Sequence, residues 1–501
     1  MVKITILNNY ILNIKTKLNQ NVSGSTLGVF RIVFGLVMLR EFLHFHDLFK
    51  GSLVFSKCLI QYDGFMWLEL PSLEWLSVFF YGMAFCSVLF VLGIHIKLNS
   101  VILFLGFSYV FLLDRGYYNN HFYFYCLLLF LFVFVDARWC SIEKQVKSIS
   151  VPYWQVLIFK LQIFVVYFFG GIAKIDYDWL NGYPLRYWLW HSSENLPTWI
   201  QTYYRTYEAA LLYSYTGMAF DLLVGFALFS KRFKRVALVF IFMFHVQNIF
   251  YFDIGTFPYA MLGCTLMFAN PSYGEKIVAA LQFGLYKKVL QFFKDKPIKT
   301  AFKWFFTRSP GLEIIPVTTT KIKYGVLKNM AKGVLVVWLM LQFIFPLRLY
   351  FYEGSASWTG EGHLFAWRMM LVDTVNGVRY WVEDEDTGER FPIAIDQYLT
   401  FRQFYKMSRT PKSFLLFAHF LRDEIIKETN RKPIIRMEIL KSVNERQPTI
   451  LNDVTLNYAE VEYSAIKRAE WILDWNFQQE AVKFDRNSID RWTKAVEKYK
   501  N

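Results

Sequence analysis

Nine long apolar runs separated by short polar connections dominate the chain up to residue 352. A helix needs about 20 apolar residues to cross the hydrocarbon core of a bilayer, and most of the runs approach this length. The runs cover residues 27–45, 75–94, 100–113, 121–135, 153–173, 208–229, 236–252, 254–269 and 334–352. The third and fourth are short, so tilt or partial insertion would be needed to accommodate them. The pattern predicts a polytopic α-helical membrane protein with about nine transmembrane helices.

The pattern changes after residue 353, where the chain is no longer membrane-like. The stretch GVRYWVEDEDTGERFPI predicts a β-hairpin with Asp386, Thr387 and Gly388 near its turn. Further elements are predicted in chain order: a helix over 400–427 broken near Pro411, strands over 434–441 and 454–463, and a helix over 464–476. Together they predict a compact α+β domain outside the membrane.

Positive charge predicts the orientation of the helices. The net charge is +15, and its excess lies in a few connections that follow the even-numbered runs. Because Lys and Arg accumulate in cytoplasmic loops, these ends are predicted to be cytoplasmic, the N-terminus inside and the tail outside. The predicted regions are a cytoplasmic segment 1–26, transmembrane helices 27–269, a basic cytoplasmic loop 270–333, a last transmembrane helix 334–352 and an extracytoplasmic α+β domain 353–501. A bacterial inner membrane fits this layout.

Composition and motif content exclude several classes of function. At 55% apolar and 20% aromatic residues, the chain is too hydrophobic for a soluble protein of its size. The basic charge follows membrane topology and no nucleic-acid motif accompanies it, so the lipid bilayer is expected as a partner and nucleic acid is not. The five cysteines show no zinc spacing, and the eight histidines are dispersed, so no metal is expected. HExxH, Walker A and Rossmann glycine patterns are absent from the sequence.

The stretch Val165–Leu185, VVYFFGGIAKIDYDWLNGYPL, places a lysine where an apolar run ends. Lys174 follows Gly170 and Gly171, and paired glycines allow another backbone or a flat ligand to approach closely. An ionisable group at membrane depth is a functional candidate. The alternative is a lysine that extends to the headgroups beside solvated aspartates.

Topology predicts that other polar residues reach the same depth as Lys174. Asn119, Asn120 and His121 open the fourth run, and His245 and Asn248 lie in the second half of the seventh. All are predicted to approach the outer face, where the tail domain is expected. His121 could instead cap a helix, and His245 with Asn248 could form a satisfied interhelical pair.

Arg31 in the first apolar run and Asp221 in the sixth are charged, and two aspartates follow Lys174. Arg31 and Asp221 are interpreted as a buried pair or a helix-packing device outside the site. Asp176 and Asp178 are interpreted as structural, orienting or capping the turn after Lys174 and pointing away from it.

Five sequence blocks carry a family resemblance. They are the stretch around Lys174 and the blocks Leu27–Met38, Asn119–Tyr125, Phe244–Tyr259 and Trp358–Met370. In their order along the chain, the five blocks resemble the vitamin K-dependent gamma-glutamyl carboxylase family, including bacterial homologues with a horizontally transferred transmembrane (HTTM) domain. In that family, the lysine that matches Lys174 is the proposed catalytic base.

The resemblance implies a reaction. A base deprotonates a reduced vitamin K, here a menaquinol-type naphthohydroquinone, and O2 attacks the product. The strongly basic oxygenated species then removes a proton from a glutamate of a protein or peptide, and the carbanion captures CO2. Lys174 would have to be partly neutral, which burial beneath Phe168, Phe169 and Trp179 would favour. His121 would act with Lys174, while Asn119, Asn120, His245, Asn248, Gly170 and Gly171 would bind the quinone.

The sequence also departs from the animal enzymes. Its tail is much shorter, and Arg368 stands where an acid precedes the two methionines of the animal form. Arg368, Met369 and Met370 are therefore only weak candidates for the glutamate side of the site. A quinol epoxidase without protein carboxylation remains an alternative, and a non-enzymatic transporter or scaffold is a more distant one.

Overall fold

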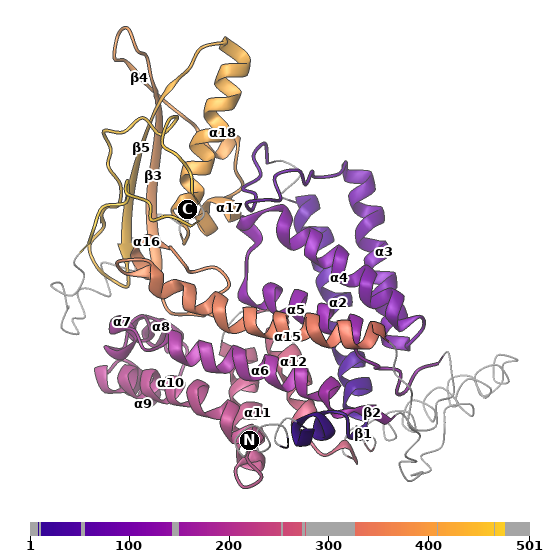
Figure 1. Cartoon of the computed structure of the whole chain (residues 1–501). Helices are drawn as coiled ribbons and strands as arrows, with labels where there is room; N and C mark the ends of the chain where they lie inside the picture. Colours follow the sequence, from indigo (N-terminus) through magenta and orange to yellow (C-terminus); the bar gives the residue numbers. More distant parts are fainter. Residues whose placement is uncertain are drawn as a thin grey trace, which may run out of the picture.

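The computed structural model describes residues 12–51, 56–142, 150–251, 254–272, 326–407, 409–464 and 466–475, together with residues 9 and 276. These residues form a bundle of apolar helices and a tail domain, residues 353–475, that stands on one face of it (Figure 1). Most of the predicted basic loop 270–333 and the segment 476–501 lie outside the described residues.

Every predicted apolar run coincides with a helix within the described part of the chain. The main helices of the bundle are α2 (Ser25–Gly51), α3 (Leu73–Leu92), α4 (Ile96–Leu113), α5 (Asn120–Phe134), α6 (Tyr153–Ala173), α10 (Tyr207–Phe229), α11 (Lys234–Tyr251), α12 (Phe257–Thr265) and α15 (Val326–Leu347). Shorter elements are β1 (Asn21–Ser23), η2 (Arg115–Tyr117), β2 (Ser150–Pro152), α7 (Tyr177–Leu180), α8 (Leu185–Ser192), α9 (Thr198–Tyr204), η3 (Leu266–Phe268) and η4 (Arg348–Phe351).

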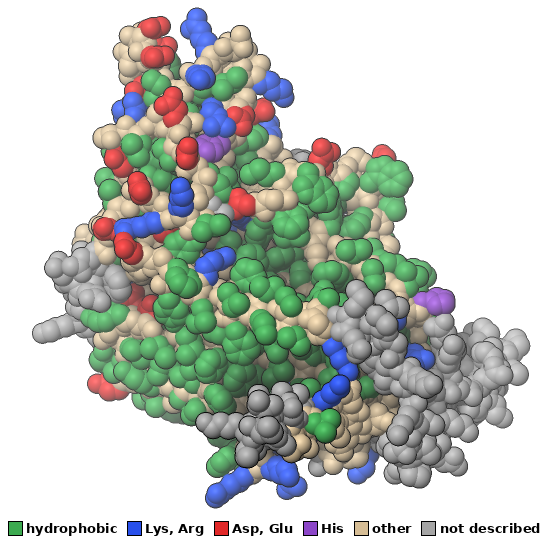
Figure 2. Space-filling view, viewed as in Figure 1, with side chains coloured by type: hydrophobic (Ala, Val, Ile, Leu, Met, Phe, Trp, Pro, Cys, Tyr) green, Lys and Arg blue, Asp and Glu red, His purple; other side chains and the backbone are tan. Residues whose placement is uncertain are grey.

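Five of the described helical segments are long and apolar enough to cross a membrane. They are Leu73–Leu92, Ile96–Leu113, Tyr153–Ala173, Tyr207–Phe229 and Lys332–Phe351. The stretches Asn120–Phe134 and Phe257–Phe268 are apolar but shorter. The bundle surface seen in Figure 2 is largely hydrophobic, whereas charged side chains gather over the tail domain. These features agree with a helical membrane protein, while the number of nine spans stays a prediction.

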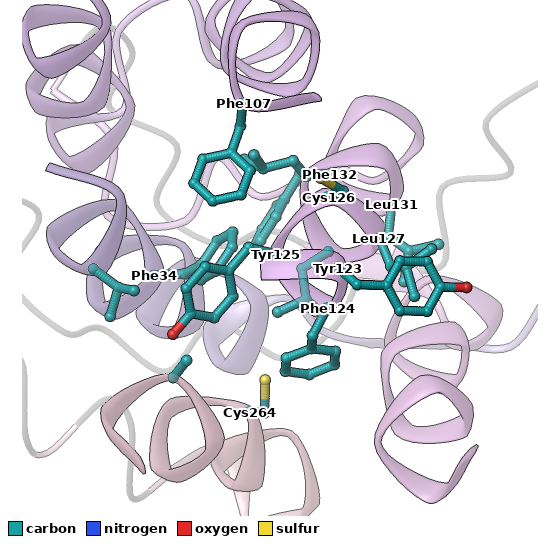
Figure 3. Packing of buried hydrophobic residues seen from close by; sticks show 14 of the residues in the cluster. Phe34, Phe107, Tyr123, Phe124, Tyr125, Cys126, Leu127, Leu131, Phe132 and Cys264 are labelled. Carbon is teal, nitrogen blue, oxygen red and sulfur yellow. The ribbon is translucent and has the colours of Figure 1, made fainter. Parts of the chain in front are cut away.

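Aromatic side chains fill the centre of the bundle around α5. Figure 3 shows side chains of α5 directed toward α2, α4 and α12. The Tyr125 ring lies 5.7 Å from Phe34 and 5.9 Å from Phe107, measured between ring centroids. Its hydroxyl is hydrogen-bonded to Thr256 at 2.8 Å, which satisfies a polar atom that would be costly to bury alone. The start of α5 is thereby fixed within a rigid core.

The tail domain is a four-stranded antiparallel sheet with helices beside it. The strand order is β4–β3–β5–β6. Its elements are α16 (Ala356–Thr359), β3 (Thr374–Glu383), β4 (Arg390–Pro392), η5 (Ile395–Gln397), α17 (Phe401–Met407), α18 (Lys412–Thr429), β5 (Ile434–Val443) and β6 (Thr449–Ile450). The predicted hairpin is confirmed as β3–β4, with Gly388 at a φ of +68° in its turn. The helix predicted to break near Pro411 is confirmed as α17 and α18.

Two predictions for the end of the tail domain are wrong. Residues 454–463 form turns instead of a strand, and no helix forms among the described residues of 464–476. The Asn452 side chain forms hydrogen bonds to β5 that a neighbouring strand would otherwise form. Its oxygen accepts from the Ile439 N–H, and its amide donates to the Met437 carbonyl. The later residues pair locally instead, since Leu473 N–H donates to the Leu451 carbonyl at 2.8 Å.

Candidate active site

Lys174 lies at the point where α6 ends and turns toward the tail domain. It is the C-cap residue of α6, and its own N–H donates to the Gly171 carbonyl. The residue is 8% exposed. Its Nζ lies 2.7 Å from Asp221 Oδ2 and 3.3 Å from the Gly170 carbonyl, and 5.2 Å from the centre of the Trp179 ring. The lysine therefore faces the protein interior, which contradicts a lysine extended to the headgroups.

The carboxylate partner of Lys174 comes from α10. The hypothesis that Asp221 lies outside the site is wrong, and so is the Arg31–Asp221 pair. Arg31 instead donates to the carbonyls of Phe90 at 2.7 Å and Cys140 at 3.1 Å, where it holds the end of α3. An acid in the middle of an apolar helix was itself a signal for a functional residue.

A glycine allows α6 and α10 to approach closely enough for this pair. A Cβ built on Gly171 would lie 2.6 Å from the backbone nitrogen of Leu222, a distance that a real side chain cannot adopt. Leu222 follows Asp221 directly, so the small residue brings the acid to the lysine. Small residues at helix contacts have the same role in other membrane proteins. Gly170, by contrast, has ordinary space around it.

The two aspartates after Lys174 have structural partners, as predicted. Asp176 caps α7 by accepting from the Asp178 N–H at 3.1 Å. Asp178 binds Arg446 of the tail domain through both carboxylate oxygens, at 2.6 and 2.8 Å. The acid beside Lys174 is thus Asp221 and not one of its neighbours in sequence.

The polar residues at the start of α5 contact the tail domain. The Asn120 amide donates to the Arg368 carbonyl at 3.0 Å, and its oxygen accepts from Tyr118 OH. The Asn119 oxygen accepts from Lys406 Nζ at 2.9 Å. Both amides are therefore used in protein contacts, so the prediction that they bind the quinone directly stays untested.

His121 has a different environment. Its half-buried ring lies 5.9 Å from Tyr125 and 6.1 Å from Phe257. The part of the chain that the structure describes offers no hydrogen-bond partner to its ring nitrogens. His121 is therefore able to bind a polar atom of a ligand.

A second histidine, His245, also lies beside Phe257. The His245 ring is 6.2 Å from the Phe257 ring, and its Nε2 is 2.8 Å from the Tyr167 hydroxyl of α6. His245 is 1% exposed, and its Nδ1 has no partner among the described residues. Asn248, one turn further on α11, is also buried. The two histidines therefore share one aromatic neighbour, and each retains a nitrogen for a ligand.

A strained segment of the tail domain reaches Lys174. A Cβ built on Gly170 would lie 3.4 Å from Met369 Cε and 3.5 Å from Asp221 Oδ2, so this methionine lies beside the ion pair. Trp367 and Met370 have φ values of +55° and +52°, which non-glycine residues rarely adopt. Such strain persists only where the surrounding structure imposes it, and it is frequent at functional sites.

Comparison with known families matches both parts of the chain. Residues 19–273 match the HTTM domain, and residues 327–478 match the lumenal domain of vitamin K-dependent gamma-carboxylase. The chain belongs to the vitamin K-dependent gamma-glutamyl carboxylase family. No solved structure matches it. It is a carboxylase-like membrane protein, and its tail domain corresponds to the lumenal domain of these carboxylases.

The polar atoms of the candidate residues are of the kinds that fit the quinol on which a vitamin K-dependent carboxylase relies. A reduced naphthoquinone is flat and carries two hydroxyl groups. The structure provides an unpaired buried Nδ1 on His245, ring nitrogens on His121, and the amine of Lys174. Buried polar atoms without partners are uncommon in proteins and call for a ligand or water. Among the described residues, no group of three or more His, Cys, Asp or Glu side chains could hold a metal ion.

The sequence named Arg368 only as a weak candidate and did not indicate its contacts within the tail domain. Besides contributing its carbonyl to Asn120, Arg368 donates to Ser357 Oγ at 3.1 Å and lies 3.9 Å from Asp176. Burial and the nearby positive charges of Arg368 and Arg409 lower the pKa of His363 well below its usual range. Arg368 is therefore a buried positive charge beside Lys174 and its partner Asp221, with Asp176 as its nearest acid.

Proposed function

We propose that this protein oxidises a reduced naphthoquinone at Lys174 and couples the oxidation to carboxylation of a protein glutamate. The observation that carries the proposal is the buried Lys174–Asp221 pair, 2.7 Å between Nζ and Oδ2, at the end of α6. A lysine that only anchored the helix would not need an acid from a second helix.

Asp221 gives Lys174 a route to its neutral form. Burying two charges is costly, and the cost is smaller when a proton moves from the ammonium to the carboxylate. This transfer leaves an amine lone pair on Lys174, held in place by the Gly170 carbonyl at 3.3 Å. The amine can then accept the proton of a quinol hydroxyl, which is general base catalysis. The bound quinol supplies the electrons for the reaction with O2.

The two histidines would hold the quinol oxygens. His245 is oriented by its 2.8 Å contact with Tyr167 OH, which leaves Nδ1 for the ligand. His121, which neighbours the same Phe257 ring, would contact the second oxygen, and that ring offers an apolar surface to the flat quinol. The hydrophobic surface of the bundle (Figure 2) suits an isoprenoid tail that extends into the lipid phase.

The buried Arg368 supports a carboxylate substrate. Arg368 is 5% exposed, and its Nε has no partner within the described part of the chain. An arginine fork is well suited to bind a carboxylate. The substrate glutamate would then approach from the tail side, with Met369 between its carboxylate and the Lys174 pair. One observation favours the alternative, epoxidation without carboxylation. Arg368 Nη2 already contacts Ser357 and Asp176, so this nitrogen is engaged within the protein and not by a substrate.

The lumenal-domain match supports a tail domain outside the cytoplasm, and the loop charges support a cytoplasmic N-terminus. Reporter fusions test this topology directly. A fusion after Arg235, at the start of α11, is expected to report a cytoplasmic location, and one in the β3–β4 turn an external location. The reverse pattern would contradict the proposed orientation.

One assay separates the proposed activity from its alternative. Purified protein in detergent is given reduced naphthoquinone, O2, labelled CO2 and a glutamate peptide, and epoxide and fixed label are scored separately. The proposal expects both products. Epoxide without fixed label would support the epoxidase alternative, and neither product would contradict quinol chemistry altogether.

A further inference from the structure

A buried cluster of four charged residues joins the tail domain to the turn that follows Lys174. Asp178 and Arg186 come from the segment after α6, and Glu445 and Arg446 from the turn between β5 and β6. All four are buried, at 2%, 1%, 6% and 2% exposure in that order. Figure 1 shows α7 and α8 next to the end of β5 from which this turn emerges.

The charges in the cluster are paired across the two parts of the protein. Arg446 binds both oxygens of Asp178, at 2.6 and 2.8 Å, and Arg186 Nε donates to Glu445 at 2.9 Å. The amide of Asn444 donates to Asp178 Oδ2 at 2.6 Å. The cluster contains two acids and two arginines, so its formal charges cancel.

The turn itself is strained in a way that directs these side chains. Asn444 and Glu445 have φ values of +47° and +66°, in the left-handed region that favours glycine. A glycine at either position would relieve the strain, but it would remove a side chain that contacts the segment after α6. Backbone strain retained by side-chain contacts points to a functional role of the turn.

The cluster is connected to Lys174 by one residue. Trp179 follows Asp178, and its ring lies 5.2 Å from Lys174 Nζ. Trp179 is also held from α10, because its Nε1 donates to the Ser214 carbonyl at 2.9 Å. A shift of Asp178 would therefore move the aromatic wall beneath the lysine. Buried ion pairs add little net stability, and their best-supported role is to specify one arrangement.

We propose that Asn444 and Arg446 are positioning residues for Lys174, holding Asp178 so that Trp179 encloses the lysine beside Asp221. The tail domain then acts on the chemistry in the bundle as well as contacting substrate. The catalytic consequence rests on the proposed role of Lys174 as a base, whereas the geometric consequence does not.

Two variants test the proposal in the full-length protein. Arg446→Lys keeps the charge but loses the two-pronged contact with Asp178. Asn444→Gly relieves the positive φ, which favours the folded state. It removes the hydrogen bond that the Asn444 amide donates to Asp178 and the one that its oxygen accepts from the Asp373 N–H. The matched control is Arg436→Lys at the opposite end of β5, whose partner Glu383 lies 2.7 Å away on the outer part of the sheet.

The first readout is the accessibility of Lys174, which does not depend on turnover. A lipid-soluble amine-acylating reagent is added in detergent, and labelling is quantified by mass spectrometry. Lys160, on the same helix α6, serves as the internal reference. Labelling of Lys174 is expected to rise severalfold in both variants, with that of Lys160 unchanged, and the control is expected to match the wild type. Unchanged labelling of Lys174 in Asn444→Gly, or an equal rise at Lys160, would overturn the proposal.

The second readout is quinol oxidation. A misplacement of about 1 Å can lower a rate about 10²-fold, so kcat is expected to fall strongly in Arg446→Lys. The KM for the quinol is expected to stay near the wild-type value, because His121 and His245 are untouched. A rise in KM with unchanged kcat would contradict positioning of the base. Absence of turnover in the wild type would refute the proposed function, and the labelling result would still decide the positioning role.

Discussion

Replacing Asp221 by asparagine tests whether the acid beside Lys174 takes part in the reaction. The substitution keeps the size and a hydrogen-bond acceptor 2.7 Å from Nζ, but it removes the group that can take the lysine proton. The amine would then have no internal acceptor for its proton. Quinol oxidation is therefore expected to fall while the bundle stays folded.

The magnitude follows from two effects. Loss of a positioned proton acceptor typically lowers a rate about 10²- to 10⁴-fold. In the ion-paired form, removing one partner of a buried pair costs about 3–5 kcal/mol, because the lysine charge is left uncompensated. The second effect acts on stability, since Lys174 and Asp221 are 8% and 6% exposed. We therefore expect a loss of about 10²-fold or more in kcat together with a lower melting temperature.

The assay measures epoxide formation at saturating quinol, with the melting temperature followed in the same detergent. Asp221→Glu keeps the carboxylate and is expected to retain part of the activity. Glu208→Gln removes an exposed acid from the same helix α10 and is expected to change neither quantity. Wild-type kcat in folded Asp221→Asn would refute the role of the acid in proton transfer.

Two further predictions concern helix packing and pH. Gly171→Ala would place a methyl group 2.6 Å from the Leu222 nitrogen, so it is expected to destabilise the bundle by about 1–3 kcal/mol and to lower activity. Gly82→Ala serves as the control, because nothing lies within 4 Å of the added methyl group. Equal melting temperatures for the two variants would contradict the packing account. Burial lowers the pKa of Lys441 to about 7, although its Nζ donates to the Trp358 carbonyl. Above that pH the unfolded chain binds more protons than the folded protein does, so tail-domain stability is expected to rise from about pH 7 toward 10. Thermal shift measurements should show less of this rise in Lys441→Met.

Much of the bundle could be predicted from the sequence, because the length of an apolar stretch is enough to predict a membrane helix. The predicted runs 121–135 and 153–173 correspond to α5 and α6 within one residue at each end. The hairpin β3–β4 was equally predictable, because its turn residues and the alternating apolar and polar positions on either side are local features of the sequence. The stretch 454–463 was misread because Leu456 and Tyr458 pack against the tail core from turns, while the side chains of Asn452 and Asn457 satisfy β5.

The site was predictable only where its residues carry a motif. Lys174 stood out because it ends an apolar run, and its neighbours Asp176 and Asp178 were placed correctly as structural residues. Asp221 was not placed, because its role depends on the contact between α6 and α10, which a single sequence does not reveal. Arg446 was missed for the same reason: its partner Asp178 is 268 residues away in the chain.

Quinol oxidation by Lys174→Ala is the most direct test of the central claim that Lys174 is the base. The measurement is epoxide and fixed CO2 from one sample of folded protein, with and without an added small amine. We predict that both products are lost together, because proton removal precedes both, and that the amine or a raised pH restores part of the epoxide. Full epoxide formation by Lys174→Ala without the amine would contradict the assignment.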